Sequence, residues 1–298
     1  MRATFSLKDI RTIGELTLEQ QARRVWEMSE PEPTTEGGLE SLAYPFDLGP
    51  ARPWQHSAHQ IGYIAPLSSG SSGPWPIVSP ATIPADLSLR NKQIDVHLSR
   101  LRIFDYPGWG THQILFTFKA QNQVPNAPEP VSFSQAYAVR QGETAAVIGQ
   151  PMFLGLSVGA VGTVIEATTV NVKNNADQDI LGFLDSPTFK AGLGLLTTPQ
   201  PAIKPLADLA IGLTKMVADH NKNVPVQYIA LGLDFGTTAM GMRLAEGNYL
   251  AVQVPNETTI KWDEWVFDPR TGAIALKTDP SSALPYNYLA FEITRSSG

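Results

Sequence analysis

Two tryptophans beside two carboxylates could do chemistry in the segment IKWDEWVFDP near the C-terminus. Trp262 and Trp265 could stack on sugar rings, and Asp263 and Glu264 could bind sugar hydroxyls or act as acids. Glycoside hydrolysis needs two carboxyl groups about 5 to 9 Å apart across a cleft. Because adjacent residues of a strand point to opposite faces, Asp263 and Glu264 cannot form that pair alone. The segment predicts glycan binding ahead of hydrolysis, with half-buried tryptophans at a strand edge as the simpler alternative.

The segment LGLDFGTT, residues 231–238, resembles the first phosphate-binding motif of the actin-like and sugar-kinase ATPases. In that family an apolar strand runs into this turn, which binds nucleotide phosphates. The family's fold continues with further strands, helices and a second phosphate-binding turn, whereas only a short stretch of strand and turn patterns follows here. We therefore expect a strand ending in a tight turn at Gly236, where glycine supplies a positive φ, and no ATP binding at Asp234.

Other residue sets with catalytic or metal-binding potential lack diagnostic spacing. His56 and His59 in WQHSAHQ could be two metal ligands, but the HExxH form is missing. The oxygen-rich segment 171–179 lacks the glycine and terminal glutamate of an EF-hand loop. The sequence contains no GxSxG, GxGxxG or Walker motif, and no cysteine for thiol catalysis. We predict no catalytic residue and no cofactor, lean against an enzyme, and leave metal binding open.

Composition narrows the class of protein. The chain has 298 residues, 43% of them hydrophobic, and a net charge of −6. Without a basic run, it lacks the phosphate-neutralising face of most nucleic-acid binders. Its most apolar stretch, residues 152–167, is shorter than the about 20 residues of a membrane span and is interrupted by glycine. We therefore expect no nucleic acid partner and no membrane span, and the N-terminus and the lack of cysteine indicate a cytoplasmic protein.

Alternating apolar residues predict an antiparallel β-sandwich. The alternation is clearest in IDVHLSRLRIF, QILFTFKAQ and VSFSQAYAV, and it returns after residue 223 in VQYIALGLDF, NYLAVQVP and NYLAFEIT. A helical insertion around residues 186–221 separates the two groups. Its stronger helix, PLADLAIGLTKMVADHNK, has an apolar stripe that we expect to cover the sandwich. The stripe comprises Leu206, Leu209, Ala210, Leu213, Met216 and Val217.

The N-terminal region begins with a helix and continues as a proline-rich segment. Thr17-Leu-Glu-Gln20 has the form of a capping box and predicts the helix start. From about Ser29 to Asp86, repeated prolines disfavour both helix and central strand. Trp54, Trp75 and several aliphatic residues interrupt this segment, so we expect an extended arm that docks on its own sandwich or on a neighbouring subunit. The predicted domains are therefore residues 1–86 and 87–298.

One segment also carries a resemblance to a known domain. VHLSRLRIFDYPGWGTHQILFTF, residues 96–118, resembles the opening of a C2-type β-sandwich, with an alternating strand, a loop containing Asp and Gly, and an aromatic strand. The resemblance covers about 25 residues and implies a sandwich. It would place calcium-binding aspartates near this loop, where Asp95 and Asp105 are the only nearby candidates.

These observations favour a non-enzymatic binding or assembly module that acts through protein–protein contacts, either with a partner or by self-association. Trp54 and Trp75 are the expected contact residues of the arm. A glycan-binding protein or glycoside-acting enzyme that uses Trp262 and Trp265 is the first alternative. A calcium-dependent surface binder is the second.

Overall fold

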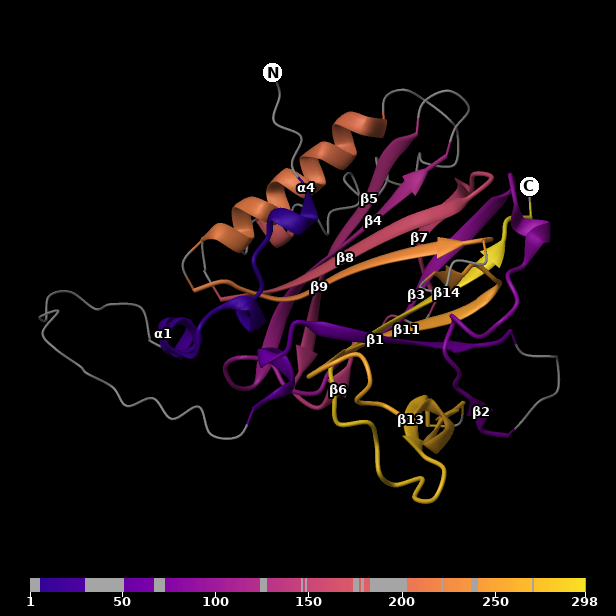
Figure 1. The fold of residues 1–298 in the computed structure, drawn as a ribbon. Coiled ribbons are helices and arrows are strands. Elements are labelled where there is room, and N and C mark those ends of the chain that lie inside the picture. Colours follow the sequence, from indigo (N-terminus) through magenta and orange to yellow (C-terminus); the bar gives the residue numbers. More distant parts are fainter. Residues whose placement is uncertain are drawn as a thin grey trace, which may run out of the picture.

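The computed structural model describes residues 6–29, 51–66, 73–123, 128–145, 147, 149–173, 177, 180–182, 203–220, 222–236, 241–269 and 271–297. Two β-sheets pack face to face around the main core, with a helix outside one sheet and a small sheet outside the other (Figure 1). The predicted mainly β sandwich is confirmed. In the described part of the chain, every helix falls short of the length and apolar character that membrane crossing requires.

The first sheet has six strands, in the order β1-β11-β14-β3-β6, with β7 also paired to β3. The strands are β1 (Ala58–Ile64), β3 (Gln93–Ile103), β6 (Glu143–Thr144), β7 (Gln150–Ser157), β11 (Gly247–Val254) and β14 (Tyr288–Arg295). All their pairings are antiparallel. The strand pattern predicted for residues 94–103 corresponds to β3.

The second sheet has five strands, in the order β10-β9-β8-β4-β5. They are β4 (Thr111–Asn122), β5 (Glu129–Arg140), β8 (Gly162–Val172), β9 (Val224–Asp234) and β10 (Met242–Arg243). The long strands pair antiparallel, and only the two-residue β10 lies parallel to its neighbour. The turn between β3 and β4 carries the chain from the first sheet to the second.

Aromatic side chains join the two sheets in the core. The ring of Phe118 on β4 lies 5.3 Å from that of Phe291 on β14 and 5.9 Å from that of Phe153 on β7. Phe291 in turn stacks on Tyr249 of β11. Strand alternation places these rings inward, because every second residue faces the opposite sheet.

The helix α4 (Ile203–Asp219) packs on the outer face of the second sheet, and it therefore covers the sandwich as predicted (Figure 1). Its buried face differs from the predicted stripe. Ala210 and Val217 are buried as expected, but Leu209 and Met216 are 45% and 39% exposed. The helix is apolar on most of its circumference, so periodicity alone could not decide its orientation. Buried positions that the stripe omitted are Ile211, Thr214 and Ala218.

A hydrogen-bonded pair of threonines contributes to the orientation of α4. The hydroxyl of Thr214 lies 2.7 Å from that of Thr117 on β4, and Thr214 also donates to the carbonyl oxygen of Ala210. Burying these hydroxyls is favourable only if they are hydrogen-bonded. Because Thr117 faces the helix, rotating α4 toward the predicted stripe would leave it without this partner.

The three-stranded sheet β13-β12-β2 covers the outer face of the first sheet. It comprises β2 (Trp75–Pro76), β12 (Trp265–Asp268) and β13 (Ala273–Leu276). The prediction of a continuous strand through IKWDEWVF is wrong at its first half, because Trp262–Glu264 form a 3-10 helix before β12 begins. The argument that Asp263 and Glu264 point to opposite faces of a strand therefore does not apply.

The N-terminal helix α1 (Leu18–Ser29) begins as its capping box predicts. The backbone N–H of Gln20 donates to the Thr17 hydroxyl over 3.3 Å, and the N–H of Thr17 donates to the Gln20 side chain over 3.2 Å. The described parts of the segment called an arm belong to the sandwich itself: β1 pairs along its full length with β11, and β2 pairs with β12. These described parts of the segment therefore dock on the same chain, and the domain boundary at residue 86 stays a prediction.

Candidate functional site

The turn between β3 and β4, residues Phe104–Gly110, has a backbone held at several points; we call it the Trp109 turn. The N–H of Asp105 donates to the side chain of Asn287 over 3.0 Å, and the Asn287 amide donates back to the Asp105 carbonyl oxygen over 2.9 Å. The amide of Asn171 donates to the carbonyl oxygen of Pro107 over 2.8 Å. Each bond satisfies a backbone group that would otherwise need water, so the turn is fixed to both sheets.

Tyr106 anchors the turn from within. Its side chain is fully buried, and its hydroxyl lies 2.7 Å from that of Thr169 on β8 and accepts a 2.6 Å hydrogen bond from Gln227 on β9. Burial raises the pKa of Tyr106 above its usual range, so the phenol stays neutral. A neutral phenol can donate one hydrogen bond and accept another, and Thr169 and Gln227 are the two partners.

Trp109 stands at the tip of this fixed turn with 82% of its surface exposed. Gly108 and Gly110 on either side have backbone φ angles of 97° and 83°, values that residues with a Cβ rarely adopt. The two glycines therefore allow the chain to reverse sharply and present the indole to solvent. Exposed indole area of this size is unusual, because tryptophan is mostly buried on average.

His112, the second residue of β4, lies buried beneath the turn. Its Nδ1 is 3.1 Å from the Asn171 amide, and its ring contacts that of Tyr106 edge to face. Burial, with a smaller contribution from the charge of Lys173, lowers the pKa of His112 to about 4. The imidazole is therefore neutral near pH 7 and supports the turn as a packed polar group.

A cation and a histidine–aspartate pair lie next to the turn. The Cε of Lys173, just after β8, is 3.6 Å from the point where a Cβ on Gly108 would stand. The Lys173 N–H donates to Asn223, whose amide donates to the buried Asp177. His220 places its Nδ1 2.8 Å from the same carboxylate. These contacts connect the end of α4 and the start of β9 to the Trp109 turn.

The acidic side chains near the turn are engaged by neighbouring residues. The contacts described for His220 and Asp177 are with each other and with Asn223, and they include no Ser or Thr hydroxyl that the pair could activate. Burial raises the pKa of Asp105, and the charge of Arg52 opposes that shift. Arg52 and Gln141 both donate to Asp105, at 3.3 and 2.8 Å, so this carboxylate is engaged in structure.

The structure places the two tryptophans of the predicted glycan site in packing roles. Trp262 is 8% exposed, and its indole N–H donates to the carbonyl oxygen of Ile61 on β1. Its ring lies so close to Gly62 that a Cβ there would be 2.9 Å away. Trp265 is half-buried at the start of β12. With its ring held against β1, Trp262 cannot offer a stacking face to a sugar.

The two acidic residues of that segment lie on the surface, and neither of them contacts a second carboxylate among the described interactions. Asp263 and Glu264 are exposed, and Glu264 pairs with Lys261 at 3.5 Å. An exposed pair of this kind contributes little stability and is screened by salt. The two residues lie within one turn of 3-10 helix rather than across a cleft, which does not fit the geometry of a glycosidase.

The predicted arm residues also pack against their own chain. Trp54 is 2% exposed within the main core. Trp75 is half-buried on β2, with its ring 5.3 Å from that of Phe267 on β12. The Trp54 ring is therefore closed to another molecule, whereas the Trp75 ring is covered only in part.

Asp234, at the end of β9, is held by its own neighbours. It accepts hydrogen bonds from the N–H of Gly236 and from Arg243, at 2.9 and 3.1 Å. The predicted strand is present to Asp234 and a bend follows at Phe235 and Gly236, whereas Thr237 and Thr238 lie outside the described residues, so the predicted tight turn stays a prediction.

The possible metal ligands are dispersed. Burial lowers the pKa of His59 to about 4, and it lowers the pKa of His56 as well. Asp95 accepts from the N–H of Gly155 at 2.8 Å, far along β3 from Asp105. Within the described ranges, no group of three or more His, Cys, Asp or Glu side chains could hold a metal ion. Most of the segment 171–179 lies outside those ranges.

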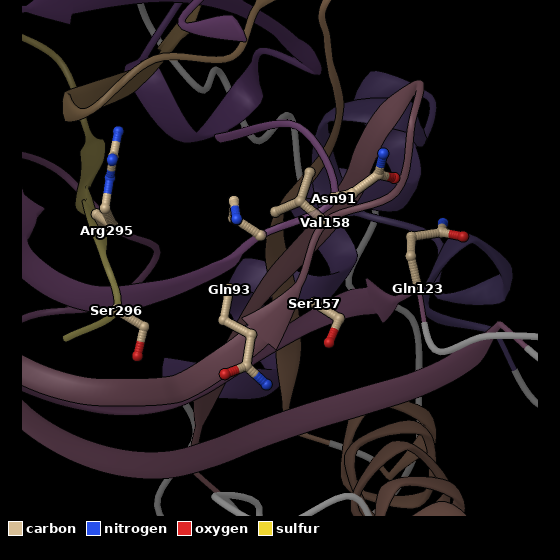
Figure 2. Close-up of a pocket in the computed structure, with 8 residues that line it drawn as sticks. Asn91, Gln93, Gln123, Ser157, Val158, Arg295 and Ser296 are labelled. Carbon is tan, nitrogen blue, oxygen red and sulfur yellow. The ribbon is translucent and has the colours of Figure 1, made fainter. Parts of the chain in front are cut away.

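A polar pocket of about 670 Å³ lies at the opposite ends of β3 and β4 from Trp109 (Figure 2). Seven of its eight lining residues are polar, two are cations and none is acidic. The lining consists of Asn91, Lys92, Gln93, Gln123, Ser157, Val158, Arg295 and Ser296. Arg295 already interacts with Glu246 and Asp86, at 3.6 and 3.9 Å. The pocket offers hydrogen bonds to a polar ligand, but no acid–base pair.

Sequence reasoning treated PGWGT only as a turn and missed Trp109 as a site residue. The signal was present, because a tryptophan between two glycines has no neighbouring side chains along the chain to pack against. Lys173 and the Asp177–His220 pair were also missed, since the residues that bring them together are far apart in sequence.

The comparisons with known proteins found no matching family model, no similar curated protein and no matching solved structure.

Proposed function

We propose that the protein is a non-enzymatic binding module that docks a partner protein on the Trp109 turn. The observation that carries the proposal is the 82% exposed indole on a turn whose backbone is held by both sheets. Tryptophan is enriched among residues that dominate binding energy at protein interfaces. A turn whose backbone is already held in place loses little backbone entropy on binding, so more of the contact energy of the indole appears as affinity.

The Trp109 turn replaces the arm as the proposed contact surface. Trp54 and Trp75 pack within the chain, whereas Trp109 is the most exposed of the large hydrophobic residues in the described ranges. Burying one large aromatic side chain is worth about 1.5 to 3 kcal/mol. Its loss should therefore weaken a complex about tenfold to more than a hundredfold without unfolding the protein.

Affinity purification from a lysate of the source organism, with quantitative mass spectrometry, tests the proposal. Trp109→Ala should lose one or a few specific proteins. Val161→Ala is the matched control, because Val161 is 79% exposed and precedes β8 at the other end of the sandwich. Sedimentation velocity on the same variants detects self-association. Retention of every specific protein, and of the oligomeric state, by Trp109→Ala would refute the proposal.

A glycan ligand is the second candidate, now at the polar pocket rather than at Trp262. The amide side chains of Gln93 and Gln123 and the hydroxyl of Ser157 are groups that pair with sugar hydroxyls (Figure 2). Titration calorimetry with a panel of oligosaccharides should detect binding that Gln93→Leu removes and Trp262→Phe retains. Absence of heat across the panel would reject this candidate.

We also propose a cytoplasmic location, which the absence of cysteine supports. Fractionation of cells that express the tagged chain tests it, and recovery outside the cytoplasm would contradict it.

A further inference from the structure

Lys173 lies over the turn next to Trp109, close enough to contact the same partner. Its Cε approaches Gly108, the residue before Trp109, and its backbone is fixed by Asn223. A ligand that packs on the indole would therefore meet the ammonium group beside it. The two residues belong to the turn after β3 and to the position just after β8, so the sandwich fixes the separation of their backbones.

The ammonium group of Lys173 has no carboxylate partner in the described part of the chain. Asp105 accepts from Arg52 and Gln141, and Asp177 is bound by His220 and Asn223, as described above. The buried carboxylates of this end of the sandwich are thus occupied by other donors.

The burial of Lys173 is consistent with a missing anion. Burial lowers its pKa from the usual lysine value, and among the described residues no carboxylate opposes that shift. A half-buried cation has lost part of its water without gaining an ion pair, which is unfavourable. A carboxylate supplied by a partner would restore that interaction and add charge-assisted hydrogen bonds.

We infer that the Trp109 turn binds an acidic peptide segment of its partner, in which a carboxylate pairs with Lys173 while an adjacent apolar side chain packs on Trp109. The inference rests on the proposed function and specifies the chemistry of the partner. Charge complementarity carries it: an indole on a fixed turn supplies contact area, and a cation without a carboxylate partner among the described residues selects the sign of the neighbouring charge.

Selection from a random dodecapeptide display library tests the inference on the full chain. Peptides enriched on the wild-type protein should combine Asp or Glu with a nearby aromatic or aliphatic residue. Lys173→Gln should remove the acidic preference, and Lys173→Glu should enrich Lys or Arg instead. Lys92→Gln, at the polar pocket on the opposite end, is the control and should select the same peptides as the wild type.

Affinities of the best synthetic peptide provide the second readout. Lys173→Gln should weaken binding roughly tenfold, and the dependence on salt concentration should largely disappear in that variant. Melting curves of each variant check that it is folded. Peptides that need Trp109 but show no acidic preference would overturn the inference and leave the proposed function standing. Failure to enrich any peptide that requires Trp109 would overturn both.

Discussion

Two histidines whose ring Nε2 atoms are buried should make the stability of this protein depend on pH in a defined window. Burial lowers the pKa of both His59 and His112 to about 4, from 6.5 in the unfolded chain. Between these values the unfolded state binds more protons than the folded state. Each histidine therefore contributes stability that is complete above pH 6.5 and is lost as the pH falls toward 4.

The magnitude follows from the size of the shifts. Each histidine should cost about 2 kcal/mol of folding free energy on going from pH 7 to pH 5. Two independent sites would then cost about 4 kcal/mol, a large fraction of the stability of a typical domain. Asp105 acts in the opposite direction, because burial raises its pKa. A raised carboxyl pKa favours the folded state as the pH falls.

Urea unfolding at intervals between pH 7.5 and 4.5, followed by tryptophan fluorescence and circular dichroism, measures this dependence. Wild type should lose several kcal/mol, and His59→Gln and His112→Gln should each flatten the curve by about 2 kcal/mol while lowering stability at pH 7. A wild-type curve that stays flat from pH 6.5 to 5 would show that these histidines are protonated in the folded state or accessible to water.

Three further predictions follow from the packing. Ile211→Ala on α4 should lower the free energy of unfolding by about 2 to 5 kcal/mol, because Ile211 is 1% exposed. Leu209→Ala should change it by less than about 0.5 kcal/mol. Equal costs of the two substitutions in urea unfolding would contradict the observed helix face. Gly162→Ala should destabilise the protein more than Gly110→Ala. A Cβ at residue 162 would stand 2.0 Å from the Leu233 carbonyl oxygen, whereas a Cβ at residue 110 would meet nothing within 4 Å. Thermal melts should show the lower melting temperature for Gly162→Ala, and the reverse order would refute the reasoning. Deletion of residues 1–86 should unfold the sandwich, because it removes β1 and Trp54; a cooperative melt of the truncated chain would show that residues 1–86 are a separable arm.

The sandwich could be predicted because alternation is a local property of each strand. The pattern around Ile114, Phe116 and Phe118 places every second side chain on the core face whatever the partner strand. The orientation of α4 could not be predicted in the same way. Leu209 and Ile211 are equally apolar, and the sequence does not show which of them faces Thr117 and the apolar surface of the sheet.

Prolines obscured β1. The segment around Ala58–Ile64 has prolines on both sides, yet the strand itself has none and pairs at the edge of its sheet, where flanking prolines cost no ladder hydrogen bond. The IKWDEWVF segment was misread for a related reason. Its alternation fits a strand, but the 3-10 helix at Trp262 depends on the indole reaching Ile61, which is 201 positions away.

The candidate site depends on contacts that no local pattern contains. Trp109 could have been singled out by its two flanking glycines, but Lys173, His220 and Asp177 reach the turn only after β8, α4 and β9 have packed. The presentation of Trp109 to solvent is also a tertiary property, since Asn287 and Asn171 hold the backbone beneath it.

Site-specific photo-cross-linking at residue 109 tests the central claim most directly. A photoreactive phenylalanine derivative replaces Trp109, and the same derivative at the exposed Glu257 serves as the control. Irradiation in a lysate of the source organism should give a discrete adduct from position 109 that is absent from position 257. Excess unlabelled wild-type protein should prevent formation of this adduct, whereas excess Trp109→Ala protein should not. Identical adduct patterns from the two positions, or competition by Trp109→Ala as strong as by wild type, would contradict a docking role for the Trp109 turn.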